Sequence, residues 1–231
     1  MEYQPATVGP EILEVLRAEW DALLRPFGAA EGPIREVLAA LIRLYAREGR
    51  FYHTLRHVQE VLQVVGNLSS LTADPAAVRF AAWFHDAIYD PRAPDNEERS
   101  AVLCEQSLAR LGVPRPTAAA AAAMIRATQH HQVLAGDRDC QVLLDADLAI
   151  LGALPPRYAE YAADIRREYA WMPEAEYRVG RSRVLQAFLR RKPIYFTEPM
   201  RAALEERARQ NLRAELAALA RDQGAVQSGP A

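Results

Sequence analysis

The chain has 231 residues, of which half are hydrophobic and a quarter are charged, the composition of a globular protein with room for a sizeable core. A formal net charge of -2 gives no basic field that would favour a nucleic-acid partner, and two cysteines are too few for a disulfide framework. Neither a signal-peptide pattern nor an apolar run long enough for a membrane span is present, so we expect a soluble, cytoplasmic protein with no membrane partner.

Apolar residues recur at helical spacing along most of the chain. The pattern predicts helices over residues 10–24, 33–48, 54–66, 74–86, 95–108, 118–131, 139–151, 155–169, 174–189 and 198–219. Thr54 is the expected N-cap of the third helix, and Asp74 with Pro75 is the expected start of the fourth. Glycine and proline residues between these segments indicate where the helices end.

Strand signals are nearly absent. Only residues 193–197 alternate briefly as a strand would, and Pro193 argues against that interpretation. We therefore predict an all-α fold, a single-domain helical bundle over residues 1–221, followed by a disordered tail over residues 222–231. The apolar N-terminal helices are a candidate face for a homodimer.

The adjacent pair His85-Asp86 ends the apolar run that begins at Ala81. Burying a histidine and an aspartate there is unfavourable unless each has a strong partner, and a divalent metal ion is a partner for both. Other residues of ligand type lie elsewhere in the chain: His53, His57, Asp145 and Asp147.

Two of these candidate ligands also have apolar neighbours in the sequence. His57 follows Leu55 and precedes Val58, and Asp147 lies within an apolar segment, where polar groups need partners. His53 and His57 are four residues apart, so they share one helical face if both belong to the helix. The alternative is that these are ordinary surface or core residues, and spacing alone does not decide between the two interpretations.

Several segments together resemble the HD superfamily of metal-dependent phosphohydrolases, and more closely a bacterial branch of predicted HD phosphohydrolases. They are YHTLRHV (52–58), FHDAIYD (84–90), DNEERSA (95–101), DADLAILG (145–152), IYFT (194–197) and ERARQNL (206–212). The resemblance extends from about Trp20 to Leu219. It implies an HD-type helical fold and hydrolysis of a phosphate ester by water that a metal ion activates.

The resemblance also implies a ligand set, with one divalent ion (Mn, Mg, Fe, Ni, Co or Zn) as the cofactor. The ligands implied by the matching motifs are His57, His85, Asp86 and Asp147. Asp147 is preferred to Asp145 because the family's ligand aspartate follows an alanine, as Asp147 follows Ala146. His53 is the candidate general acid. HD members with two metals carry further histidine ligands, and here only the adjacent His130 and His131 lie in that region. At most one of them is expected to face the site, because neighbouring side chains on a helix point about 100° apart. We therefore favour one metal ion, with His130 as the first candidate and His131 as the other to contact the substrate phosphate or the bound water; a second, weaker metal ion bridged by Asp86 is the alternative.

The substrate expected is a small phosphorylated molecule, a phosphomonoester or a phosphodiester, with nucleotides among the candidates. Arg56 is a candidate for binding phosphate oxygens, while Asp90, Asn96 and Glu97 are candidates for the rim of the site. For Asn96 and Glu97 an equally good interpretation is a helix N-terminus. The alternative functions are a nucleotide-binding or regulatory module without turnover, and an inert helical interaction protein.

Overall fold

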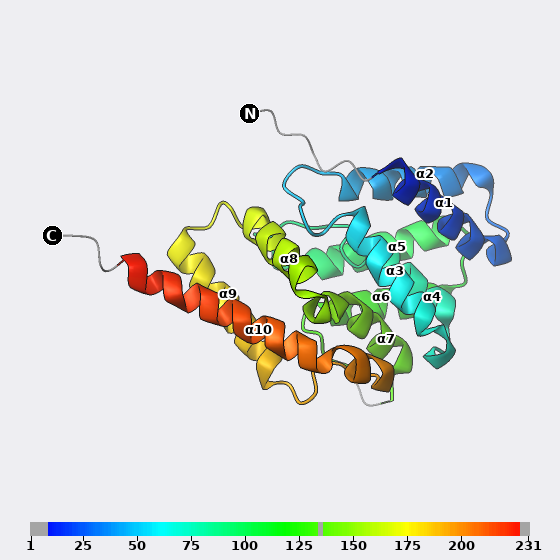
Figure 1. Cartoon of the computed structure of the whole chain (residues 1–231). Helices are drawn as coiled ribbons and strands as arrows, with labels where there is room; N and C mark the ends of the chain where they lie inside the picture. The colour runs from blue at the N-terminus through cyan, green and yellow to red at the C-terminus, as the bar shows by residue number, and fades with distance from the viewer. Residues whose placement is uncertain (1–8, 134–135, 227–231) are drawn as a thin grey trace. The chain divides into compact units, whose positions relative to one another are not determined.

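The structure of the protein is a computed structural model that describes residues 9–133 and 136–226, and within this part every regular element is a helix (Figure 1). The all-α prediction is therefore confirmed, and residues 193–197 form no strand. None of the helices in the described ranges combines the length and apolarity that a membrane-spanning segment needs.

The chain divides into two units, Met1–Asp147 and Leu148–Ala231, and each is described by itself. The first contains α1 (Pro10–Leu24), α2 (Glu31–Tyr45), α3 (Leu55–Asn67), α4 (Pro75–Phe84), α5 (Asn96–Arg110), α6 (Arg115–Thr128) and α7 (Arg138–Asp147). The second contains a short 3₁₀ helix (Leu148–Gly152), α8 (Pro155–Glu168), α9 (Glu174–Arg190) and α10 (Glu198–Val226). The prediction of one domain over residues 1–221 stays a prediction.

Helix α4 forms the core of the first unit. It packs against α3, α5, α6 and α7, which lie around it in Figure 1. All residues from Phe80 to His85 are buried, as expected for a helix that is apolar on every side. Trp83 meets Trp20 of α1 edge to face, with ring centroids 5.2 Å apart. The His-Asp pair that follows α4 therefore lies at the inner end of a core helix.

Both predicted N-cap residues occupy the N-cap position of their helices, but only one of the two side chains makes the capping hydrogen bond. The Asp74 carboxylate accepts a hydrogen bond from the amide of Ala77 at 3.0 Å, as an N-cap does. Thr54 precedes α3, but its side chain makes no capping bond; the hydroxyl instead donates to the Tyr52 carbonyl at 3.5 Å. Asp95 likewise precedes α5 without capping it.

Several helix ends differ from the prediction. Helix α2 ends at Tyr45 and not at residue 48, and α6 covers Arg115–Thr128 and not residues 118–131. Helix α7 stops at Asp147, and a 3₁₀ helix replaces its expected continuation to residue 151. Helix α10 extends to Val226, past the expected end at residue 219, so the predicted tail over 222–231 begins inside this helix. Residues 227–231 lie outside the described residues.

A buried ion pair joins α9 to α10 in the second unit. The Arg181 guanidinium, 8% exposed, donates to both carboxylate oxygens of Glu215 at 2.7 and 3.1 Å, and it also donates to the Tyr161 hydroxyl. The Tyr158 hydroxyl donates to the same carboxylate at 2.5 Å. These tyrosines therefore serve the packing of the second unit.

Candidate metal centre

His85 occupies the C-cap of α4, where the buried helix ends. Its side chain is 1% exposed, and its Nδ1 atom lies 2.9 Å from the carbonyl oxygen of Ala82. A carbonyl oxygen can only accept a hydrogen bond, so Nδ1 carries the ring proton and donates it. The neutral ring therefore keeps its lone pair on Nε2, the tautomer that a metal ligand needs.

His57, in the first turn of α3, faces His85. The two Nε2 atoms are 3.1 Å apart, and the His57 side chain is 2% exposed. The ring of Tyr52 packs against the His57 ring with centroids 4.6 Å apart. Two neutral lone pairs repel each other at this distance, so either one Nε2 atom carries a proton or both share a cation.

Two carboxylates complete the cluster. The Oδ2 atom of Asp86 lies 3.1 Å from Nε2 of His85, and the Oδ1 atom of Asp147 lies 3.2 Å from Nε2 of His57. Each of these four residues offers one ligand atom, and the four atoms all lie within 4.8 Å of one another. Asp145, the other aspartate considered from the sequence, is buried but lies outside this group.

The spacing within the cluster is close to that of a coordination shell. Ligand atoms about 2.1 Å from a metal ion lie about 3.0 Å apart at octahedral corners and about 3.4 Å apart at tetrahedral corners. The imidazole nitrogens lie 3.1 to 3.6 Å from each other and from the carboxylate oxygens. Two imidazoles and two carboxylates suit several divalent ions, so the cluster could hold a metal ion.

The electrostatics of the cluster favour a positive charge at its centre. Burial alone would lower the pKa of His85, but the carboxylates of Asp86 and Asp147 outweigh burial and hold that pKa well above its ordinary value. Burial would raise the pKa of Asp86, but His85 and His53 hold that pKa well below the usual range. The pKa of Asp147 is lowered in the same way, against burial, by the histidines that contact it. The carboxylates are therefore anionic around a site that attracts a cation.

His53 borders this cluster from the turn before α3. It does not lie on the helix, so it shares no helical face with His57, and the condition set by the sequence is not met. Its Nε2 atom is 4.0 Å from Oδ2 of Asp86, and its ring stacks on Tyr89 with centroids 4.2 Å apart. His53 thus lies beside the His/Asp cluster, and its catalytic role stays a prediction.

Of the two adjacent histidines, the structure brings His131 to the cluster. The Nε2 atom of His131 lies 2.9 Å from the second carboxylate oxygen of Asp147, whereas His130, our first candidate, is exposed. The cause is local backbone geometry. Helix α6 ends at Thr128, and His131 has a positive φ of 48°, which turns its side chain away from the direction a continuing helix would give.

The residues expected to bind substrate lie in different settings. Arg56 is exposed, with its Nε atom 3.3 Å from Glu60 on the same helix. Asp90 and Asn96 close the loop after α4, because the Asn96 amide accepts from the Asp90 N–H at 3.0 Å and donates to its carbonyl at 2.8 Å. Glu97 is half-buried in the first turn of α5. The helix-start interpretation of Asn96 is thereby favoured, and substrate binding by these residues stays a prediction.

Arg50 is a candidate functional residue that the sequence did not indicate. It is 4% exposed, and its guanidinium donates hydrogen bonds to the backbone carbonyls of His53, Asp86 and Ala87. A sequence motif could not reveal this, because every residue carries a backbone carbonyl.

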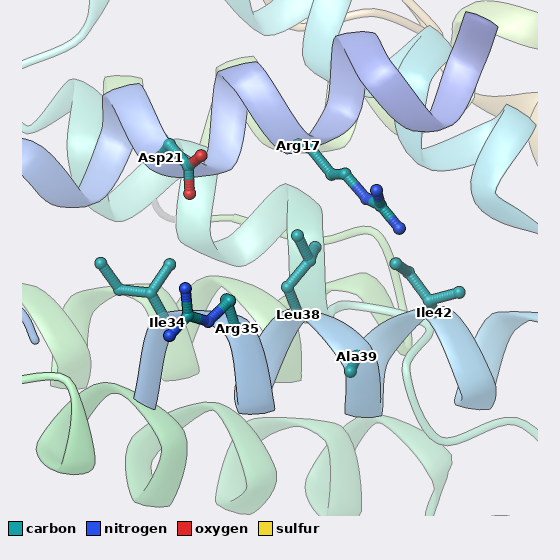
Figure 2. A pocket seen from close by; sticks show the side chains of 7 residues that line it. All are labelled: Arg17, Asp21, Ile34, Arg35, Leu38, Ala39 and Ile42. Carbon is teal, nitrogen blue, oxygen red and sulfur yellow. The ribbon is translucent and has the colours of Figure 1, made fainter. Parts of the chain in front are cut away.

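A separate pocket of about 420 Å³ lies between α1 and α2. Figure 2 shows Arg17 and Asp21 projecting from α1 towards Ile34, Leu38 and Ile42 of α2. None of the cluster residues lines it. These helices are the candidate dimer face, and a homodimer stays a prediction.

Comparisons with protein-family models, curated proteins and solved structures gave no match. The helical fold and the His/Asp cluster are compatible with an HD-type protein.

Proposed function

We propose that the chain is a metal-dependent phosphohydrolase of the HD type, with one divalent ion held by His57, His85, Asp86 and Asp147. The observation that carries this proposal is the pair of buried Nε2 atoms 3.1 Å apart, flanked by two carboxylates within 3.6 Å. Two imidazoles and two carboxylates that face one another in a largely buried site need a positive charge between them; a proton on Nε2 supplies one unit of charge, and a divalent ion would supply two. The motif resemblance supports phosphate-ester hydrolysis as the chemistry.

A bound divalent ion would lower the pKa of a coordinated water towards roughly 7 and polarise the phosphoryl group. Side chains of the protein would orient the water and donate a proton to the leaving oxygen. Asp86 and Asp147 orient the water through carboxylate oxygens. His53, 4.0 Å from Asp86 and stacked on Tyr89, is held beside the cluster to give a proton to the leaving oxygen.

The proposed substrate is a small phosphomonoester or phosphodiester, with nucleotides among the candidates. The side chains of His53 and Asp86 are 18% and 19% exposed, so a solvent-borne phosphate can approach the cluster from their side. Arg56, Asp90, Asn96 and Glu97 are the proposed contacts for the rest of the substrate.

Elemental analysis of protein purified without an affinity tag or chelator tests the metal site. We expect about one equivalent of a divalent metal per wild-type chain and its loss in Asp86→Asn. Asp95→Asn is the matched control, because Asp95 is exposed and lies outside the cluster. Absence of metal from the wild type, even after incubation with Mn²⁺ or Ni²⁺, would overturn the proposal.

Phosphate release tests turnover once the metal is known. p-Nitrophenyl phosphate, bis(p-nitrophenyl) phosphate and a set of nucleotides serve as substrates. We expect His53→Ala to retain its metal and to lower kcat about 10²- to 10⁴-fold, the usual effect of removing a general acid. Tight nucleotide binding by the wild type with no turnover would instead indicate a regulatory module.

A further inference from the structure

The guanidinium of Arg50 is buried beside the cluster without belonging to it. Arg50 lies in the segment between α2 and α3 and directly follows Gly49, whose φ of 88° is in the left-handed region that favours glycine. The side chain is 4% exposed. A charged group at this depth needs several partners to offset the loss of hydration.

Those partners are backbone carbonyls from two distant segments. One terminal nitrogen of Arg50 donates to the carbonyl of His53 at 2.9 Å and to the carbonyl of Asp86 at 2.7 Å. The other donates to the carbonyl of Ala87 at 2.8 Å. The last two carbonyls belong to the turn that follows α4. One side chain thus joins the turn that carries His53 to the turn that carries Asp86.

Aromatic rings fix the guanidinium in this place. Its central carbon lies 5.0 Å from the ring centroid of Tyr45 and 5.4 Å from that of Tyr89, distances typical of cation–π contacts. The Tyr45 hydroxyl donates to the carbonyl of Trp83, so its ring is itself held against α4. Tyr89 is also the ring on which His53 stacks.

We propose that Arg50 is a positioning residue, which sets the distance between the proton-donating imidazole of His53 and the ligand Asp86. This inference rests on the proposed function for the roles of those two residues. The backbone link from Arg50 spans the two segments whose side chains approach to 4.0 Å. A lysine cannot replace it, because only a planar guanidinium directs several donors to carbonyls on different segments at once.

Two variants, Arg50→Met and Arg50→Lys, test this role, with Arg181→Met as the matched control. Arg181 is also buried and also lies on a tyrosine ring, 5.1 Å from the centroid of Tyr161, but it belongs to the second unit. Its replacement reports the effect of losing any buried arginine. Each folded variant is compared by thermal unfolding, by Mn²⁺ titration calorimetry and by NMR of the histidine rings at one pH.

The NMR readout follows His53 directly. The chain has only five histidines, so the ring-proton spectrum is simple, and His53→Gln assigns the signal of interest. Stacking on Tyr89 is expected to shift the His53 ring protons upfield. We expect this shift to collapse towards the free-imidazole position in both Arg50 variants and to persist in Arg181→Met. Mn²⁺ affinity should fall about 10- to 100-fold in the Arg50 variants alone, as for other residues that orient ligands.

The outcomes separate this inference from the proposed function. If the wild type binds no metal, the proposed function fails, and the His53 shift alone still decides the role of Arg50. Arg50 variants that lose thermal stability as Arg181→Met does, yet keep the wild-type His53 shift and Mn²⁺ affinity, would overturn the inference. It would also be overturned if both Arg50 variants failed to fold while Arg181→Met folded, because Arg50 would then support the fold as a whole.

Discussion

In His85, a hydrogen bond to a backbone carbonyl fixes which ring nitrogen carries the proton of the neutral imidazole. Because Nδ1 donates its proton to the Ala82 carbonyl, Nε2 is the nitrogen that faces His57 and the two carboxylates. In the metal-free chain the raised pKa of His85 favours a proton on that nitrogen. A metal ion would take the place of this proton, so binding should release it.

The His131–Asp147 hydrogen bond gives a prediction at this scale. His131→Ala should weaken metal binding about 10- to 100-fold, because it removes the partner that fixes one ligand carboxylate. His130→Ala is the matched control, since His130 is adjacent but exposed, and it should bind metal as the wild type does. Titration calorimetry with one divalent ion measures both. A larger loss for His130→Ala than for His131→Ala would assign the contact with the cluster to His130 and not to His131.

At the scale of elements, the His/Asp cluster depends on three helix ends. Helix α3 presents His57 in its first turn, α4 ends at the His85-Asp86 pair, and α7 ends on Asp147. A short shift of any of these ends would move a ligand atom out of the cluster. In α4 the end that matters to the site is the C-terminal one, where His85 is the C-cap residue, and not the end that Asp74 caps.

Helix capping gives the second prediction. Asp74→Ala should lower the free energy of unfolding by about 1 kcal/mol, because the Asp74 carboxylate accepts a hydrogen bond from the first turn of α4. Asp95→Ala should lower it by no more than about 0.5 kcal/mol, because Asp95 makes no capping bond and only a 3.8 Å exposed contact with Arg99. Urea unfolding distinguishes the two. Equal losses would contradict the assigned caps.

Elements and ligands were predictable to different degrees. The apolar periodicity predicts α1 at its observed bounds, and the burial of His57 follows from its apolar neighbours, whereas Asp147, with equally apolar neighbours in sequence, is only half-buried. The choice of His131 over His130 depends on one positive φ angle, which periodicity does not encode. The role of Arg50 depends on carbonyls far away in the sequence, and no side-chain pattern marks those.

For the whole molecule, the titrating groups of the cluster make the stability of the metal-free chain depend on pH. In the metal-free chain, the raised pKa of His85 contributes stability that is complete below the ordinary value of 6.5 and is lost as pH rises through the raised value. The lowered pKa values of Asp86 and Asp147 contribute stability that is present above the ordinary value of 3.8 and is lost as pH falls. Metal-free protein should therefore be most stable between these two values.

The third prediction is tested by measuring the thermal unfolding midpoint as a function of pH, with EDTA and with metal. With EDTA, the unfolding midpoint should fall as pH rises above about 6.5, whereas with saturating metal it should hold or rise, because deprotonated His85 binds the ion. At 100 times the dissociation constant, the ion should stabilise the folded chain by about 2.7 kcal/mol. Identical pH profiles with EDTA and with metal would contradict the assigned cluster.

Asp147 is the last residue of the first unit, and the other three ligands precede it in the chain. A nascent chain leaving the ribosome therefore carries three ligands for some time before the fourth emerges. An ion bound at the complete cluster acts only on a chain that has been synthesised and folded as far as Asp147. If the cluster holds a metal ion, that ion would therefore stabilise first units completed as far as Asp147 and not shorter nascent chains.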